Sequence, residues 1–272
     1  HERLVGSEMC IRDRIHNHMK FFLAPMQGLT GYTVRNAFHH HFDYIDKYYT
    51  PFIPAAKRMN AKIKRDIDPV NNDGITLIPQ AMSIVADEVI DLHRQLVPYG
   101  YDEINVNLGC PSGTVVSKKR GSGILAYPDM LDSFLDELYT KADFPVSIKT
   151  RVGFNDDELW PKLIEIYSKY PISELTVHPR VQKDFYKNTP RMDDFALAMQ
   201  KINPDKTTLC YNGDITDTNS FNALTDYFPD IDEIMIGRGL FANPALIAEL
   251  KGISMDKAEL RERLRNLSLI HI

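Results

Sequence analysis

The residues of this chain best suited to chemistry are a cysteine and the loop that carries it. Cys110 follows INVNL, an alternating apolar run over residues 104–108 that predicts a β-strand. Pro111 cannot extend a strand ladder, so we expect the thiol on the first loop residue, where it can meet a ligand. Free cysteines are usually buried and inert, so a purely structural Cys110 is an equal alternative on spacing alone.

A basic segment rich in glycine follows this cysteine. Lys118, Lys119 and Arg120 stand directly before the sequence GSG at residues 121–123. Cationic side chains on a flexible loop are suited to an anionic ligand. A solvated surface loop explains the same residues, because charged side chains are mostly exposed in any globular protein.

Short apolar runs alternate with amphipathic segments along most of the chain. The runs predict strands over residues 21–25, 44–49, 76–80, 103–107, 145–150, 174–178, 207–211 and 233–236. The amphipathic segments predict helices over residues 86–97, 130–139, 156–169, 192–201 and 218–227. Strands separated by helices indicate parallel pairing, and eight of them close a (β/α)₈ TIM barrel of about 250 residues. An open doubly wound sheet is the main alternative, but APMQGLTG after the first strand lacks its G-x-G-x-x-G spacing.

In such a barrel, the active site lies at the carboxyl ends of the strands. The candidate residues at those ends are Pro25, Met26, Gln27, Gln80, Asn107, Cys110, Lys149, Arg151, His178, Arg180, Asn212, Gly213, Asp214, Gly237, Arg238 and Gly239. Each alone has an ordinary explanation, such as a solvated lysine or an Asn-Gly-Asp turn. Their joint occurrence at successive strand ends favours one binding site.

The last two predicted strands are followed by residues that suit a phosphate group. Asn212-Gly213 and Gly237-Arg238 stand where barrels of this type often bind phosphate. The glycines let backbone N–H groups approach the anion, and Arg238 adds positive charge. Asn243 and Pro244 then predict the start of a short helix, whose amino end favours the same phosphate. We therefore expect a phosphorylated cofactor.

Two further side chains indicate what kind of cofactor this is. Lys149 can place a cation against an electron-rich ring edge, and Gln80 can form a hydrogen bond to the ring. This pair suits an oxidised flavin, whose reduced form carries negative charge near N1.

The composition limits the cell compartment and the partners. Hydrophobic residues make up 43% and charged residues 25%, which is ordinary for a soluble globular protein. No run approaches the roughly 20 apolar residues of a membrane span, so we expect no membrane partner.

The number and spacing of the cysteines indicate the cell compartment. The three cysteines, Cys10, Cys110 and Cys210, are far apart, so the sequence has no local CxxC metal-binding pattern and a reducing cytoplasm is indicated. Because the chain has a net charge of −5, it can bind a nucleic acid only through a local basic patch. We expect a cytoplasmic monomer without a metal site.

The two ends of the chain do not fit the barrel. The tracts MCIRDR and LSLIHI resemble translated adapter sequence, so we expect non-native tails over residues 1–14 and 267–272. Residues 15–250 are expected to form the flavin-binding barrel. Residues 251–266 are expected to hold only the start of a carboxyl-terminal helical domain, with a helix from Met255.

Six segments together resemble the tRNA-dihydrouridine synthases. They are APMQGLTG, NVNLGCPSGTVVSKKRGSGIL, VSIKTRVG, LTVHPR, YNGDI and IMIGRGLFANP, and the resemblance spans roughly residues 21–250. The cysteine segment is specific to that family, whereas the phosphate motifs also occur in other flavin barrels. The resemblance implies an FMN-dependent reduction of the C5–C6 bond of uridine in tRNA, with NADPH or NADH recharging the flavin.

The same resemblance implies a role for each candidate residue. Cys110 matches the family's proton donor, so its thiol should not have a strongly lowered pKa. Residues that match flavin contacts are Pro25, Met26, Gln27, Gln80, Lys149 and His178, with Asn212, Gly213, Asp214, Gly237 and Arg238 on the phosphate side and Asn107 and Arg180 near flavin and substrate. Candidates for the tRNA backbone are Lys118, Lys119 and Arg120, together with Lys57, Arg58, Lys62, Lys64 and Arg65. Val181 departs from the commoner H-x-R-T of the family.

Two other functions stay open at this point. One is a flavin barrel that acts on a free pyrimidine, similar to dihydroorotate or dihydropyrimidine dehydrogenases. The basic loop after Cys110 favours RNA over that alternative. The other is an RNA-binding barrel without a cofactor, which the joint presence of Gln80, Cys110, Lys149 and Arg238 argues against.

Overall fold

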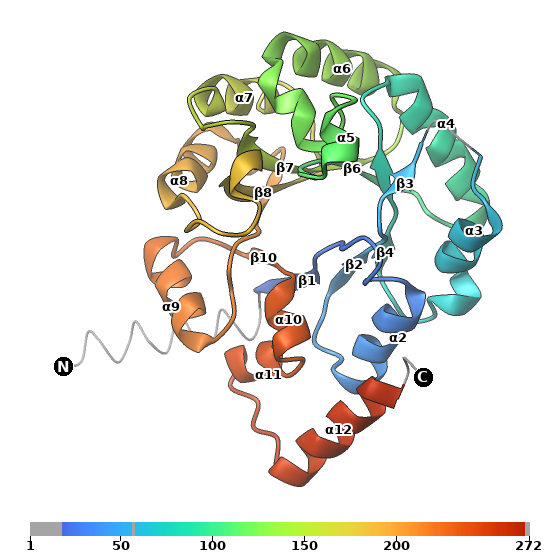
Figure 1. Cartoon of the computed structure of the whole chain (residues 1–272), viewed down its shortest axis with the longest axis vertical. Helices are drawn as coiled ribbons and strands as arrows, with labels where there is room; N and C mark the ends of the chain where they lie inside the picture. Colours follow the sequence, from blue (N-terminus) through green and yellow to red (C-terminus); the bar gives the residue numbers. More distant parts are fainter. Residues whose placement is uncertain (1–17, 56–57, 270–272) are drawn as a thin grey trace.

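The computed structural model describes residues 18–55 and 58–269, which form a ring of strands surrounded by helices (Figure 1). The predicted tail over residues 1–14, Cys10 and Lys57 lie outside the described residues. Within the described part, none of the helices combines the length and the apolar character that a membrane crossing requires.

The ring is one sheet of short parallel strands in the order β3-β5-β6-β7-β8-β9-β10-β1-β2-β4. The strands are β1 (Lys20–Leu23), β2 (Lys47–Tyr49), β3 (Ile53–Pro54), β4 (Leu77–Ile78), β5 (Gln80–Met82), β6 (Ile104–Leu108), β7 (Val146–Gly153), β8 (Glu174–Val181), β9 (Thr208–Tyr211) and β10 (Glu233–Ile236). β1 pairs with β10 on one side and with β2 on the other, so the first and last strands of the chain are neighbours.

The ring closes through a strand that a proline interrupts. β4 and β5 are separated only by Pro79, and they pair with different neighbours: Ile78 aligns with Tyr49, whereas Gln80 aligns with Asn105. Pro79 has no N–H to donate, but its carbonyl oxygen accepts the N–H of Asn105 at 2.9 Å. β4 and β5 therefore act as one strand, and β3 extends β2 in the same manner. The short strands form the (β/α)₈ barrel that the sequence predicts.

Helices cover the outside of the ring (Figure 1). They are α2 (Tyr32–His41), α3 (Ala61–Ile67), α4 (Ala86–Leu96), α5 (Gly113–Val116), α6 (Pro128–Lys141), α7 (Trp160–Tyr167), α8 (Met192–Lys201), α9 (Thr218–Tyr227), α10 (Arg238–Ala242), α11 (Leu246–Leu250) and α12 (Lys257–Leu269), with 3₁₀ turns η1 (Pro69–Asn71), η2 (Val97–Tyr99), η3 (Gly121–Ala126) and η4 (Gln182–Asp184). α8 and α9 match their predicted ranges residue for residue. Asp217 caps α9, because its carboxylate accepts the N–H of Ser220 at 2.8 Å.

Two predicted helices start several residues later than expected. α7 begins at Trp160 rather than at residue 156, because Asp157 forms an ion pair with Arg191 at 3.0 Å and residues 154–159 form bends and a turn. The helix predicted from Asn243 starts only at Leu246, as α11, and the unpredicted α10 precedes Asn243. Asn243 ends α10, and its side-chain oxygen accepts the N–H of Ala245 at 3.1 Å in the turn between the two helices.

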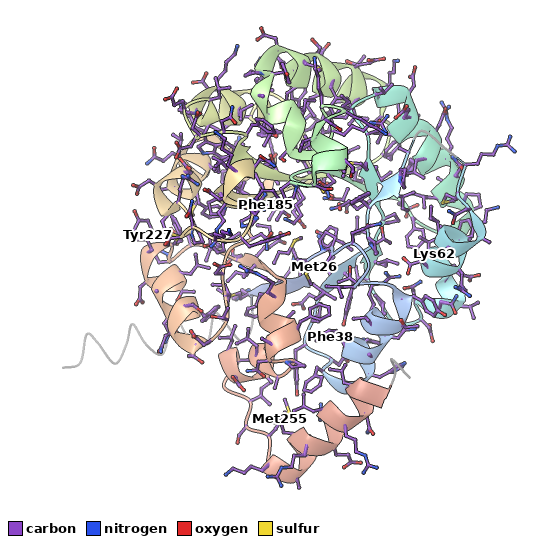
Figure 2. The ribbon with its side chains drawn as sticks, in the orientation of Figure 1. Met26, Phe38, Lys62, Phe185, Tyr227 and Met255 are labelled. Carbon is purple, nitrogen blue, oxygen red and sulfur yellow. The ribbon has the colours of Figure 1, made fainter. Side chains whose placement is uncertain are left out.

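Apolar side chains fill the layer between the sheet and the helices. Every residue of β6, β8 and β10 is buried, as expected for parallel strands covered on both faces. Trp160, the single tryptophan, is fully buried, and its indole N–H donates to the carbonyl of Asp194 at 2.8 Å. Met26 and Phe185 lie toward the centre of the ring, whereas Tyr227 lies on its outer side (Figure 2).

The last helix packs against the first helix of the barrel. α12 lies beside α2, and the guanidinium of Arg263 donates to the carbonyl of His41 at 2.8 Å (Figure 1). The helix predicted from Met255 starts at Lys257, and residues 267–269 continue it.

Charged side chains occupy the amino end of the barrel. The Glu174 carboxylate accepts hydrogen bonds from Lys47 Nζ at 2.6 Å and from the Tyr49 hydroxyl at 2.7 Å. Glu233 lies beside this group, with Lys20 Nζ 3.4 Å from one carboxylate oxygen. Its other oxygen is buried and has no hydrogen-bond partner among the described residues. Burial, and then the charge of Glu174, raise the pKa of Glu233 to about 7.

We expect Glu233→Gln to stabilise the folded chain above neutral pH. The folded-state pKa of about 7 exceeds the ordinary value of 4.5, so folding takes up a proton between these pH values. The ionised carboxylate then destabilises the native state at higher pH. The amide should raise the free energy of unfolding by roughly 1–3 kcal/mol at pH 8, and progressively less toward pH 5.

Urea unfolding at pH 5 and pH 8 measures this effect. Glu262→Gln, at an exposed position of α12, is the matched control. A stabilisation that is equal at both pH values would contradict the assigned ionisation of Glu233.

Candidate functional site

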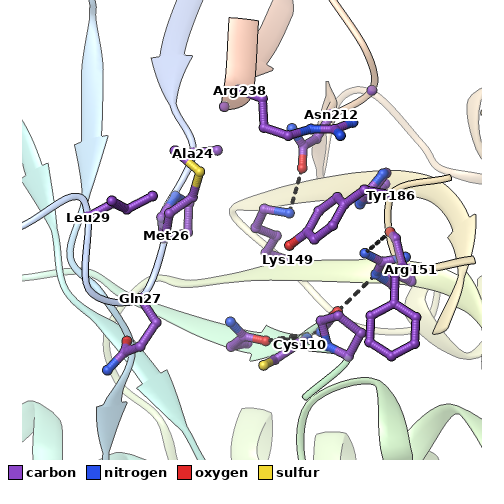
Figure 3. Close-up of a pocket in the computed structure, with 18 of the residues that line it drawn as sticks. Ala24, Met26, Gln27, Leu29, Cys110, Lys149, Arg151, Tyr186, Asn212 and Arg238 are labelled. Carbon is purple, nitrogen blue, oxygen red and sulfur yellow. Dashed lines mark hydrogen bonds between the residues drawn. The ribbon is translucent and has the colours of Figure 1, made fainter. Parts of the chain in front are cut away.

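A cavity opens at the carboxyl ends of the strands, in the centre of the ring. Its volume is about 560 Å³, within the range of about 300–1,000 Å³ typical of small-molecule sites. All thirteen predicted catalytic and cofactor residues line it: Pro25, Met26, Gln27, Gln80, Asn107, Cys110, Lys149, His178, Asn212, Gly213, Asp214, Gly237 and Arg238. Figure 3 shows Met26 and Leu29 on one side of the cavity, and Lys149, Arg151 and Tyr186 on the other.

The predicted RNA contacts do not line this cavity. Arg180 is only 1% exposed and is bonded to Asp214. Arg120 pairs with Glu88 at 3.2 Å, and Lys119 Nζ lies 4.3 Å from the centroid of the Tyr127 ring. Lys118 forms no side-chain hydrogen bond or ion pair with any residue that the structure describes. The basic loop therefore has fewer free cations than its sequence indicates.

A chain of amide side chains connects β5, β6 and β7 beside the cavity. Gln80 donates to the side-chain oxygen of Asn105 at 2.8 Å, and Asn105 donates to the Ser147 hydroxyl at 3.0 Å. Asn107 donates to the side-chain oxygen of Gln80 at 2.8 Å, and its own oxygen accepts the N–H of Cys110 at 2.9 Å. Gln80 and Asn107 are therefore held in fixed orientations, and Asn107 fixes the start of the cysteine loop.

The Cys110 thiol is partly buried at the edge of the cavity. Burial raises its pKa above the ordinary value, against the opposing effects of a hydrogen bond from the Ser112 backbone and the charges of Arg151 and Lys149. A thiol of this kind is neutral at pH 7 and keeps its proton. It is therefore suited to donate a proton rather than to act as a thiolate nucleophile.

Lys149 is half-buried in the cavity wall. Its Nζ donates to the side-chain oxygen of Asn212 at 2.6 Å, across from β7 to the loop after β9 (Figure 3). Burial, and then the charge of Arg151, lower the pKa of Lys149 to about 7. An electron-rich group against Lys149 would restore its charge, because an adjacent negative charge favours the ammonium form.

Further positive charge gathers near the ends of β8, β9 and β10. Arg180 and Arg238 both bond to the carboxylate of Asp214, Arg238 at 2.6 Å. Burial alone would raise the pKa of Asp214, but the hydrogen bonds and charges of Arg180 and then Arg238 hold it below its ordinary value. Burial, and then the charges of Arg151 and other cations, hold the pKa of His178 well below its ordinary value, so its imidazole is neutral. One carboxylate thus faces two guanidinium groups.

The loops after β9 and β10 approach each other closely. A Cβ atom on Gly239 would lie 2.0 Å from the carbonyl oxygen of Ile215, so this position accepts only glycine. Gly237 lies one residue before α10 and lines the cavity with Gly213. Backbone groups of both loops are therefore exposed to one ligand.

Some residues that line the cavity had no predicted role. Arg151, which the sequence places at the end of the same strand as Lys149, lies two residues after it on β7. Phe185 and Tyr186, which were missing from the predicted site, come from the loop after β8. The guanidinium carbon of Arg151 lies 5.5 Å from the Tyr186 ring centroid, and that of Arg238 lies 4.9 Å from it. The sequence did contain a signal for this pair. Phe185 and Tyr186 are adjacent aromatic residues in the loop after a predicted strand that ends in polar residues.

Comparison with known proteins places the chain in a family. Residues 22–268 match the model of the family described as dihydrouridine synthase (Dus). The tRNA-dihydrouridine synthase B of Pasteurella multocida (strain Pm70) is 27% identical over 266 residues, which cover 93% of this chain and 76% of that protein. The tRNA-dihydrouridine synthase B of Escherichia coli (strain K12) is 31% identical over 165 residues, which cover 60% of this chain and 50% of that protein.

A probable tRNA-dihydrouridine synthase of Staphylococcus aureus (strain N315) is 34% identical over 154 residues, or 55% of this chain and 46% of that protein. The chain thus spans about half the length of several curated relatives that it matches.

Solved structures support the fold. Morphinone reductase superposes with a TM-score of 0.58 at 11% identity, over 89% of this chain and 88% of that one. The 3-hexulose-6-phosphate synthase of Salmonella typhimurium gives a TM-score of 0.52 at 14% identity, over 93% of this chain and 100% of that one. The family match covers nearly the whole described barrel, and the chain belongs to the dihydrouridine synthase family.

Proposed function

We propose that this chain reduces the C5–C6 double bond of a uridine in tRNA to dihydrouridine, with FMN as cofactor and NADPH or NADH as the source of electrons. The observation that carries the proposal is that one cavity collects a protonated thiol, a half-buried lysine and the glycine loops after β9 and β10. The membership of the dihydrouridine synthase family supports the same reaction.

The residues of the cavity fit FMN. Gly213, Gly237 and Arg238 would hold the phosphate, because two close backbone loops and a guanidinium meet there. Lys149 would lie against the ring, where its cation stabilises negative charge. Gln80 has one side-chain N–H that is not used by Asn105 and lines the cavity, so it can donate to a ring atom.

FMN held in this cavity would supply the hydride for C6 of uracil. Cys110 donates the proton to C5, because burial raises the pKa of the thiol and keeps it protonated at neutral pH. Asn107 holds the N–H of Cys110 and so fixes where the thiol is presented. Lys149 and the neutral His178 form part of the cavity wall.

The RNA would contact the rim of the cavity. Lys118 is the best candidate for a phosphate contact in the loop, because Arg120 is bonded to Glu88 and Lys119 lies against Tyr127. The target base must leave its stack to reach the bottom of the cavity. The same shortage of free cations favours a second candidate function, the reduction of a free pyrimidine.

The visible absorption spectrum of the purified chain tests the proposed function. We expect a yellow protein that NADPH bleaches and that unmodified tRNA reoxidises, with dihydrouridine detected by mass spectrometry of the RNA. Reoxidation by free uracil and not by tRNA would assign the free-pyrimidine function instead. A folded, colourless chain that does not take up FMN would refute both.

We expect Cys110→Ala to retain FMN and to lose uridine reduction. Removal of a general acid typically lowers the rate by about 10²–10⁴-fold. Dihydrouridine formation under single-turnover conditions measures the loss, and the flavin absorbance measures retention. Cys210→Ala is the control, because Cys210 is fully buried on β9 and does not line the cavity. A Cys110→Ala chain with full activity would contradict the role of the thiol.

Lys149→Met should lower the reduction potential of the bound flavin. Loss of the cation destabilises the electron-rich reduced form, and a tenfold change in the equilibrium corresponds to about 30 mV for two electrons. We expect a decrease of about 30 mV or more in a spectroelectrochemical titration. Lys187→Met, at an exposed position of the loop after β8, should leave the potential unchanged.

Lys118→Glu should weaken tRNA binding without affecting the flavin. A single exposed phosphate contact contributes little, so we expect a loss of affinity of about 3- to 10-fold and a reduction of the salt slope by about 1. Filter binding at several salt concentrations measures both quantities. Lys162→Glu on α7, whose Nζ is bonded to Asp129, is a control with the same charge change. An equal loss in both variants would show a non-specific charge effect.

A further inference from the structure

The backbone around Cys110 is completely hydrogen-bonded. The Asn107 side-chain oxygen accepts the N–H groups of Gly109 and Cys110, at 3.1 and 2.9 Å. The carbonyl of Cys110 accepts the Ser122 hydroxyl at 2.8 Å and the Ser122 N–H at 3.1 Å. The carbonyl of Gly109 accepts the Nε–H of Arg151 at 3.0 Å. These contacts come from β6, η3 and β7, which are rigid parts of the barrel.

The last polar group of this loop is held from a different loop. The carbonyl of Pro111 accepts the side-chain N–H of Gln182 at 2.9 Å. Gln182 is the first residue of η4, directly after β8, and only 9% of its surface is exposed. It does not line the cavity, so an effect of Gln182 on the reaction must pass through Pro111.

Arg151 joins the same two loops a second time. Besides Gly109, its guanidinium donates to the carbonyl of Val181 at 2.9 Å and to that of Phe185 at 2.7 Å. Residues 109–111 and 181–185 are therefore linked by side chains that bond to backbone carbonyls. Phe185 and Tyr186 follow Gln182 and are 46% and 50% exposed at the cavity. A ligand that contacts this aromatic pair also acts on the loop that carries the thiol.

We propose that Gln182 is a positioning residue for the Cys110 thiol, which it fixes through the carbonyl of Pro111. This inference rests on the proposed function, in which the thiol delivers a proton to the substrate. Proton transfer requires the donor within about 2.6–3.2 Å of its acceptor, so a small displacement of the loop slows the step. Pro111 has a fixed φ and directly follows Cys110, so a shift of its carbonyl is transmitted to the thiol.

Gln182→Met tests the proposal. The methionine side chain has a similar length but no N–H, so it removes the hydrogen bond and preserves most of the packing. With flavin reduced by dithionite, we expect dihydrouridine formation in a single turnover to slow about two- to twelvefold, the effect of one neutral hydrogen bond. The affinity for tRNA and the FMN content should stay unchanged.

A second measurement follows the thiol itself. Iodoacetamide should alkylate Cys110 faster in Gln182→Met than in the unaltered chain, by a similar factor, because the released loop exposes the thiol more often. Peptide mass spectrometry distinguishes Cys110 from the other cysteines. Lys183→Met is the control in the neighbouring position, since that lysine is exposed and its side chain forms no hydrogen bond or ion pair with the described residues.

Gln182→Glu is a second variant that tests the proposal if Gln182→Met does not fold. It has the size of glutamine but presents a carboxylate to the Pro111 carbonyl, so the turnover rate should fall at least as far. Unchanged single-turnover rates in both variants would overturn the proposal. Slower turnover with an unchanged alkylation rate would also overturn it, because the effect would then not pass through the thiol.

Different results would refute the proposed function and the positioning role of Gln182. An unaltered chain that forms no dihydrouridine refutes the proposed function. In that case the alkylation rates still decide whether Gln182 controls the Cys110 loop.

Discussion

The burial of positive charge around one cavity is the constraint that shapes the site. Removing an ion from water costs several kcal/mol unless hydrogen bonds or opposite charges compensate it. Arg151 is compensated by three backbone carbonyls, and Arg180 by the carboxylate of Asp214, which also pairs with the exposed Arg238. Lys149 has only an amide partner, and burial lowers its pKa to about 7. The site is therefore organised for an anionic ligand.

Much of the site was predictable because the barrel is regular. Polar residues at the ends of successive parallel strands meet at one end of a barrel, so the order of strands was sufficient to bring Gln80, Lys149 and Arg238 together. The core strands and α8 and α9 followed from apolar periodicity in the same way. These predictions use only patterns among residues that are near one another in the sequence.

The features that the sequence analysis missed depend on contacts between distant residues. Arg120 is bonded to Glu88, 32 positions away, so its charge is not free for RNA. α7 starts late because Asp157 pairs with Arg191, a residue of the loop before α8. The role of Gln182 depends on Pro111, 71 positions away. No local pattern records these partners, and each of them changes the availability of a side chain.

The charges at the two ends of the barrel also affect how a substrate approaches. The carboxyl end has Lys149, Arg151, Arg180 and Arg238 around the carboxylate of Asp214, although the chain as a whole has a net charge of −5. At the amino end, Glu174 and Glu233 are paired with Lys47 and Lys20. Positive charge therefore gathers locally at the mouth of the cavity. A polyanion that comes close to this mouth is attracted to it, so the local charge favours approaches in which the mouth faces the ligand.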